Sequence, residues 1–240
     1  MCGRYSLKKD ASAYSEYLLD LGFEEFHDVP RYNIAPTQFA PIVRLGSHNQ
    51  PELAKLRWGL VPSWAKDPSI GARMINARGE TVTQKPSFRA AFKRRRALIP
   101  ADGYFEWRKV GPEKRPYRFH LRQESVFAMA GLWEAALLPD GSEMETFSII
   151  TCPPNAIASK VHDRMPVIIP PEAYGRWLET DEQEAKSLVD LLAPYANDDL
   201  EVDEVSKQVN NPRNDTPACI EPLNGPDPSG GPPTELDLWT

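Results

Sequence analysis

The feature that most constrains this fold is a series of short β-like segments that turn residues, above all proline, keep interrupting. Proline accounts for 24 of the 240 residues, about twice its usual share, and it cannot donate a hydrogen bond inside a helix or a sheet. The segments rich in β-branched and aromatic residues lie at 40–45, 53–60, 96–101, 104–109, 117–121, 126–134, 146–151 and 166–170. Short strands broken in this way predict a curled, mainly antiparallel β-sheet or barrel core.

Four further segments have helical patterns and would flank that core. They lie at 10–22, 86–96, 170–179 and 181–192, with Asp10 and Ser87 as the expected N-caps of the first two. These patterns together predict an α+β fold. Residues 1–223 would form a single domain, and residues 224–240 have the Pro/Gly-rich composition of a disordered C-terminal tail.

Cysteine usage and hydropathy indicate a protein of a reducing compartment. The three cysteines are an odd number without paired spacing, and the amino terminus lacks the pattern of a secretory signal. The longest apolar stretch, 126–138, contains Glu134 and is too short to span a bilayer. We therefore expect a cytoplasmic protein, associated with the nucleoid if the source is bacterial, that is monomeric and has no membrane partner.

The net charge of −6 conceals an uneven distribution along the chain. Residues 85–122 hold twelve Lys or Arg against three acids, whereas residues 170–206 hold eleven acids against two basic residues. A basic half could face a polyanion such as nucleic acid. The alternative is that "KRRR" at 93–96 is a solvated helix end.

The second residue is a cysteine, and removal of Met1 would make Cys2 the amino terminus. Its α-amine would then titrate at about pH 8 and its thiol at about pH 8.5, so both would be partly available as nucleophiles. An aldehyde can condense with this amine to an imine, and the thiol can then close onto the imine carbon as a thiazolidine. The pattern predicts an aldehyde trap, with a small buried cysteine as the alternative.

The sequence contains no phosphate-binding loop, dinucleotide fingerprint, serine elbow or Cys/His spacing for zinc, so we expect no cofactor and no metal. The remaining candidates are short polar segments in apolar or turn-like surroundings, which we call islands. In "GYFEW" a strand would point Glu106 away from Phe105 and Trp107, either as a proton-transfer group or as a cross-strand ion-pair partner. In "KVHDRMPVII", His162 could move protons and Arg164 could bind phosphate.

Six islands, in this order and spacing, resemble the SOS response-associated peptidase (SRAP) family over about residues 2–223. They are "MCGRYS", "RYNIAPTQ", "RWGLVPSWAKD", "INARGET", "ADGYFEW" and "VHDRMPVII". The resemblance implies a DNA damage response protein that captures the ring-opened aldehyde of abasic sites in single-stranded DNA. Capture would be a covalent crosslink through the N-terminal cysteine, and the family name implies possible autoproteolytic removal of Met1.

The resemblance also implies a role for particular residues. The catalytic set would be Cys2 as nucleophile, Asn76 holding its amine, and Glu106 and His162 transferring protons. The DNA-binding set would be Arg4, Arg78 and Arg164 on phosphates, Asn33 and Pro36 along the DNA channel, and Trp64 as a stacking surface. Many members of the family carry a second tryptophan where this chain has Ala65, so the stacking contact of that second ring is not expected here.

Two other classes of protein stay open. Glutamine amidotransferases also begin Met-Cys-Gly, and there the thiol attacks an amide, so an N-terminal cysteine amidohydrolase is one alternative. A non-enzymatic single-stranded DNA-binding protein is the other, with Cys2 incidental and the basic stretch supplying the affinity.

Overall fold

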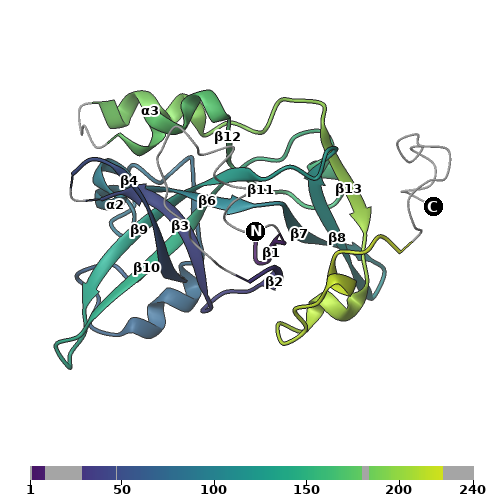
Figure 1. The fold of residues 1–240 in the computed structure, drawn as a ribbon, viewed down its shortest axis with the longest axis horizontal. Coiled ribbons are helices and arrows are strands. Elements are labelled where there is room, and N and C mark those ends of the chain that lie inside the picture. The colour runs from purple at the N-terminus through teal and green to yellow at the C-terminus, as the bar shows by residue number, and fades with distance from the viewer. Residues whose placement is uncertain (1, 9–28, 47, 180–183, 224–240) are drawn as a thin grey trace.

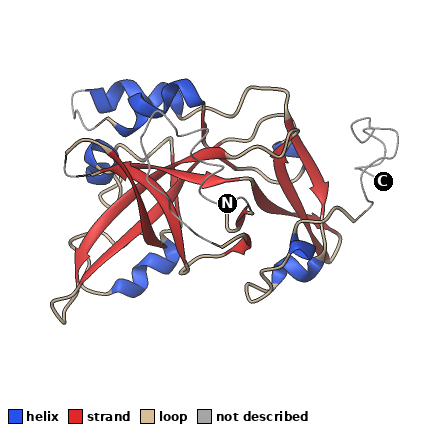
Figure 2. Ribbon diagram, in the orientation of Figure 1, coloured by secondary structure: helices blue, strands red, loops and turns tan. Residues whose placement is uncertain are grey.

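The computed structural model describes residues 2–8, 29–46, 48–179 and 184–223. The helix expected over 10–22 and the tail expected over 224–240 lie outside these ranges. Within the described ranges the chain forms two β-sheets, with the helices at the outside of the molecule (Figures 1 and 2).

The smaller sheet has five strands in the order β13-β8-β7-β1-β2 among the described residues. Their bounds are β1 Tyr5–Leu7, β2 Arg31–Ile34, β7 Gly103–Val110, β8 Glu113–Leu121 and β13 Leu200–Glu204. The expected strands at 104–109 and 117–121 are confirmed as β7 and β8. β1, β2 and β13 lie outside the segments expected to form strands.

The larger sheet follows the order β11-β10-β4-β3-β6-β9-β12, and β5 also pairs with β10. Its strands are β3 Phe39–Leu45, β4 Pro51–Trp58, β5 Asn76–Arg78, β6 Arg96–Ala101, β9 Phe127–Leu137, β10 Glu143–Cys152, β11 Met165–Pro166 and β12 Ile168–Ile169. Pairing is antiparallel except where β10 meets β4 and β5. The predicted α+β class and curled, mainly antiparallel sheet are confirmed, as two curled sheets rather than one closed barrel.

A glycine permits the close approach of two strands in the larger sheet. Gly131 on β9 lies opposite Ala97 of β6 and Ile149 of β10. A Cβ at this position would lie 2.6 Å from the Ile99 side chain. Only a residue without a side chain allows β6 and β10 to pair with β9 on both sides at this point.

Trp58, at the end of β4, joins the two sheets through the core. Its ring packs edge-on against Tyr5 of the smaller sheet, at 5.3 Å between centroids, and stacks on Phe147 of the larger sheet at 6.1 Å. The indole N–H donates to the Ile75 carbonyl at 2.8 Å, so the buried polar atom is satisfied. Trp58 is fully buried, so its ring fills the core and is not available to stack on a base.

The expected helices differ from the observed ones in their caps, lengths and type, because the described part of 181–192 forms a 3-10 helix and 170–179 forms a 3-10 turn followed by a short α-helix. The helical bounds are α2 Arg89–Arg94, α3 Tyr174–Leu178, and the 3-10 turns η2 Pro68–Arg73, η3 Ala158–Lys160, η4 Pro171–Ala173, η5 Glu184–Leu191, η6 Lys207–Asn210 and η7 Pro217–Cys219. The prediction that Ser87 caps the second helix is wrong, because α2 begins after Phe88 with no side-chain cap. The other end is stabilised by Arg96, which donates to the carbonyls of Phe92 and Lys93.

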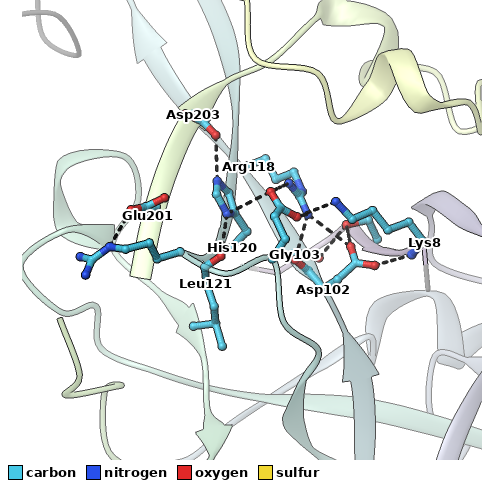
Figure 3. Close-up of polar contacts among 11 residues, drawn as sticks. Lys8, Asp102, Gly103, Arg118, His120, Leu121, Glu201 and Asp203 are labelled. Atoms are coloured by element: carbon cyan, nitrogen blue, oxygen red, sulfur yellow. Dashed lines mark hydrogen bonds and ion pairs between the residues drawn. The ribbon is translucent and has the colours of Figure 1, made fainter. Parts of the chain in front are cut away.

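A buried ionic network ties β8 to its neighbours in the smaller sheet (Figure 3). Arg118, only 2% exposed, donates to the carbonyl and carboxylate of Asp102 and to the carboxylate of Glu124. His120 lies 2.8 Å from Asp203 of β13, and the Asp102 carboxylate accepts from the backbone of Lys8. These contacts attach β1 and β13 to the central hairpin of the sheet. No described helix is long and apolar enough to cross a membrane.

Candidate active site

Cys2 lies just before β1, and its side chain is fully buried. Its backbone carbonyl accepts a 2.8 Å hydrogen bond from Asn76 Nδ2, and its sulfur lies 3.9 Å from the Arg4 carbonyl oxygen. Burial raises the pKa of the thiol, and the charge of Glu106 raises it further. The sulfur is therefore protonated at neutral pH and needs a base before it can attack.

β5 brings Asn76 to Cys2 from the larger sheet. The strand pairs in parallel with β10, with Asn76 opposite Ile149 and Arg78 opposite Thr151. The strand covers Asn76–Arg78 only, and the alternate positions Asn76 and Arg78 share one of its faces. The hydrogen bond from Asn76 runs to the carbonyl of Cys2, so this amide holds the backbone that carries the nucleophile.

Glu106 projects from β7 into the interior, with only 3% of its side chain exposed. The predicted alternation is confirmed, since Phe105 packs in a separate cluster with Val205 and Val209, whereas Tyr104 lies in the main core. The residue opposite Glu106 on β8 is Tyr117, not a basic residue. Burial raises the pKa of the carboxyl to about 8, so near neutral pH the group can both accept and donate a proton.

His162 approaches Glu106 from the loop after η3. Its Nε2 lies 3.7 Å from Glu106 Oε2, and 28% of its side chain is exposed. The backbone N–H of Arg164 donates to Nδ1 at 3.1 Å, and Asp163 lies 2.9 Å from the same nitrogen. An amide can only donate, and burial lowers the pKa of the imidazole. The ring is thus neutral, with the Nε2 proton directed at Glu106.

The three arginines expected on phosphates have different surroundings. Arg4 Nη1 donates to Asn33 Oδ1 at 2.8 Å and to a backbone carbonyl at 2.6 Å. Arg164 forms a two-point ion pair with Glu80 and also donates to the Thr151 carbonyl at 2.7 Å. The side chain of Arg78 is exposed. Arg78 is the arginine best placed to meet a ligand from solvent, while Arg4 and Arg164 are already bound to protein groups.

The three residues expected along the DNA path are not equivalent. Asn33 is fully buried, and its amide bonds to backbone carbonyls of the 209–214 segment. Pro36 follows β2 and is half-buried, beside Thr37 in the left-handed region at φ 71°. Trp64 is 59% exposed in the loop after β4 and can offer its ring to a base. The structure brings Cys2, Asn76, Glu106 and His162 together and leaves Trp64 at the surface.

Sequence reasoning assigned no role to Tyr104 or Thr151 and did not pair Glu80 with Arg164. A signal existed for Tyr104, because the alternation that placed Glu106 also placed Tyr104 on the same side of β7. The pairing of Glu80 with Arg164 carries no local signal, since 84 residues separate the two side chains along the chain. In the described ranges no group of three or more His, Cys, Asp or Glu side chains is arranged to hold a metal ion.

Comparison with known proteins gives one consistent answer. The family model described as "SOS response associated peptidase (SRAP)" matches residues 1–212. This chain belongs to the SRAP family. The matched range of this SRAP chain contains every residue of the candidate site, from Cys2 to Arg164.

Several relatives are named as abasic site processing proteins. YoqW of Bacillus subtilis is 43% identical over 224 residues, which cover 92% of this chain and 99% of that protein. HMCES of Xenopus tropicalis is 32% identical over 221 residues, 80% of this chain and 65% of that protein. A crystal structure of a protein from Bacteroides thetaiotaomicron superposes with a TM-score of 0.79 at 26% identity, covering 92% of this chain and 100% of that one.

Proposed function

We propose that this chain processes abasic sites in single-stranded DNA by capturing their aldehyde covalently through Cys2. The observation that carries the proposal is the placement of Cys2 beside a carboxyl group whose pKa is about 8 and a neutral histidine. Membership of the SRAP family and the names of the relatives support it. The chain would act as a monomer, in the cytoplasm and at the nucleoid of a bacterial source.

The chemistry begins once Met1 has been removed and the α-amine belongs to Cys2. Removal by the chain itself would be the peptidase activity that the family name describes. Glu106, with His162 beside it, donates a proton to the ring oxygen of the closed sugar as the bond from that oxygen to C1 breaks, and it takes back the proton of the C1 hydroxyl, which leaves the open-chain aldehyde. The amine adds to the aldehyde carbon, and the resulting carbinolamine loses water as Glu106 donates a proton to the departing hydroxyl and takes up the proton from the nitrogen, which leaves an imine.

The thiol then closes the ring. A carbon–sulfur bond forms at the imine carbon, the π bond of the imine breaks, and the thiol proton passes through Glu106 to the nitrogen. The product is a thiazolidine attached by two bonds, without any net oxidation or reduction. Asn76 holds the carbonyl of Cys2 during these steps, and Arg78, Arg4 and Arg164 would contact the flanking phosphates.

The test is intact-mass analysis after incubation with an abasic single-stranded oligonucleotide. Wild-type protein should lose Met1 and gain the oligonucleotide mass less one water, because imine formation releases water and ring closure releases nothing. Cys2→Ala should form no heat-stable adduct, and Cys219→Ala, which removes another buried thiol, should react normally. A full-yield, heat-stable adduct on Cys2→Ala would refute the proposal, and equal reaction with duplex DNA would refute the single-stranded preference.

A further inference from the structure

Tyr104 on β7 carries a hydroxyl group that packing alone does not explain. Its side chain is fully buried, and the hydroxyl has no hydrogen-bond partner among the described residues. The ring is held by stacking on Phe119, at 4.7 Å between centroids and an interplanar angle of 5°. Phenylalanine would make the same stack and would avoid burying an unsatisfied polar group, which is destabilising.

The position of Tyr104 connects this hydroxyl with the candidate site. Tyr104 and Glu106 are alternate residues of one strand and share a face, about 7 Å apart along it. Cys2 and Tyr104 both belong to the main buried cluster, and Phe105, which lies between Tyr104 and Glu106 on β7, donates its backbone N–H to the Arg4 carbonyl at 2.9 Å. Burial raises the pKa of the Tyr104 hydroxyl, and the negative charge of the Cys2 thiolate raises this pKa further.

The thiol of Cys2 changes its hydrogen-bonding needs during the reaction. As a thiol it can donate to the Arg4 carbonyl, 3.9 Å away. A thiolate has no proton to donate and is repelled by that oxygen, so the charged sulfur must turn toward a donor. Asn76 Nδ2 is occupied by the carbonyl of Cys2, whereas the Tyr104 hydroxyl is buried and unused.

We propose that the Tyr104 hydroxyl donates a hydrogen bond to the Cys2 sulfur when the thiol loses its proton, and thereby promotes ring closure. The inference rests on the proposed function. The hydroxyl keeps its own proton throughout, and the proton that leaves the sulfur still passes through Glu106 to the imine nitrogen. Tyr104 therefore acts on the thiazolidine step and not on imine formation.

The experiment compares Tyr104→Phe with wild type in single-turnover reactions with an abasic single-stranded oligonucleotide. Borohydride trapping measures the imine, and a heat-stable adduct measures the closed ring. We expect unchanged imine formation, ring closure slowed about ten- to a hundredfold, the range for a hydrogen bond to a charged group, and accumulation of trappable imine. The melting temperature should be equal or higher, because an unsatisfied buried group has been removed.

A double-mutant comparison separates action on the sulfur from a general effect on the site. In the Cys2→Ser background only the imine forms in quantity, so adding Tyr104→Phe should leave its rate unchanged. Tyr195→Phe is the matched control, since it removes a hydroxyl that bonds to Asp199 at 3.0 Å, outside the site. Tyr195→Phe should close the ring at the wild-type rate.

The outcomes distinguish the two proposals. If wild-type protein forms no heat-stable adduct, the proposed function fails and this inference fails with it. If wild type forms the adduct and Tyr104→Phe closes the ring equally fast, only the role of Tyr104 is overturned. A slower imine step in both the Cys2 and the Cys2→Ser backgrounds would also overturn it, because Tyr104 would then act on the binding geometry instead of the sulfur.

Discussion

The carboxyl group of Glu106 has its pKa raised to about 8 by burial, whereas an exposed glutamate would be ionised at neutral pH. A group with such a pKa can exchange protons in both directions within one reaction cycle. The neutral His162 at 3.7 Å adds a second proton-carrying atom. The chemistry assigned to the site therefore depends on how deeply β7 buries this residue.

Glu106→Gln preserves the size of the side chain but cannot carry a proton. General acid–base assistance is typically worth about a hundred- to ten-thousandfold, so we expect single-turnover crosslinking to slow by that order while DNA binding persists. Release of a preformed adduct should slow as well, because the reverse path uses the same groups. A wild-type crosslinking rate, or a loss of rate that follows only from unfolding in a melting curve, would contradict the assignment.

The raised pKa of Glu106 also predicts how stability depends on pH. In the unfolded chain the carboxyl titrates near its ordinary value of 4.5, and in the folded protein near 8. Between these values only the folded state holds the proton, so the free energy of unfolding falls as the pH rises through this window. Glu106→Gln removes that dependence.

Urea unfolding at about pH 5 and about pH 9 measures this effect. The free energy of unfolding of Glu106→Gln minus that of wild type should become more positive at the higher pH, by a few kcal/mol at most. Above the pKa that Glu106 has in the folded protein, this difference in the free energy of unfolding should no longer change with pH. A difference that is independent of pH would mean that Glu106 is ionised in the folded state across the whole range.

At the level of elements, β2 and the 207–219 segment form one unit that holds Arg4. Asn33 Oδ1 accepts from Arg4 at 2.8 Å, and Asn33 Nδ2 donates to the carbonyls of Val209, Asn211 and Asn214. Asp215 accepts from the backbone N–H of Asn33 at 2.9 Å. The side chain of Asn33 is therefore committed to protein contacts, and its influence on DNA would pass through Arg4.

Asn33→Ala should lower the free energy of unfolding by about 1–3 kcal/mol, because it leaves buried backbone carbonyls without donors. It should also weaken DNA binding, since Arg4 Nη1 loses a partner that orients it. Thermal melting and binding titrations measure the two effects, with the exposed Asn197→Ala as control. Weaker DNA binding at full stability would indicate that Asn33 lines the channel directly, as the family resemblance implied.

At the level of the whole molecule, the basic stretch over 85–122 is not one DNA-facing surface. Arg96 and Arg118 are each only 2% exposed and serve helix capping and the ionic network. Other members pair with acids of distant segments, as Arg122 does with Glu201 at 2.9 Å. Part of the charge asymmetry along the sequence is therefore cancelled when the acidic residues of β13 pack beside β8.

The salt dependence of DNA binding tests which arginines meet phosphates. Each phosphate contact on single-stranded DNA contributes about 0.7 to the slope of log affinity against log salt concentration. Arg78→Ala should reduce the slope by about that amount, and Arg122→Ala should leave it unchanged. Equal reductions in both variants would indicate that the basic stretch contributes to binding as a surface.

The sequence by itself determined the β7–β8 hairpin, most strands of the larger sheet and the direction of the key side chains, but not β1, β2 or β13. Alternation along 104–109 placed Glu106 on the other face of the strand from Phe105 and Trp107. The structure confirms this placement, because the two-residue period of a strand is a local property. The class of fold followed from proline-broken β segments for the same reason. The family could be predicted because the six islands keep their order along the chain.

Only the tertiary structure decided which groups meet. Glu80 with Arg164, Asn33 with Arg4, and the burial of Trp58 between two sheets all join positions far apart in sequence, where no periodicity links them. The pKa of Glu106 likewise depends on what covers it, since desolvation is a property of the packed interior. A sequence can name the residues of this site, but their protonation and their partners are set by the neighbours that folding brings to them.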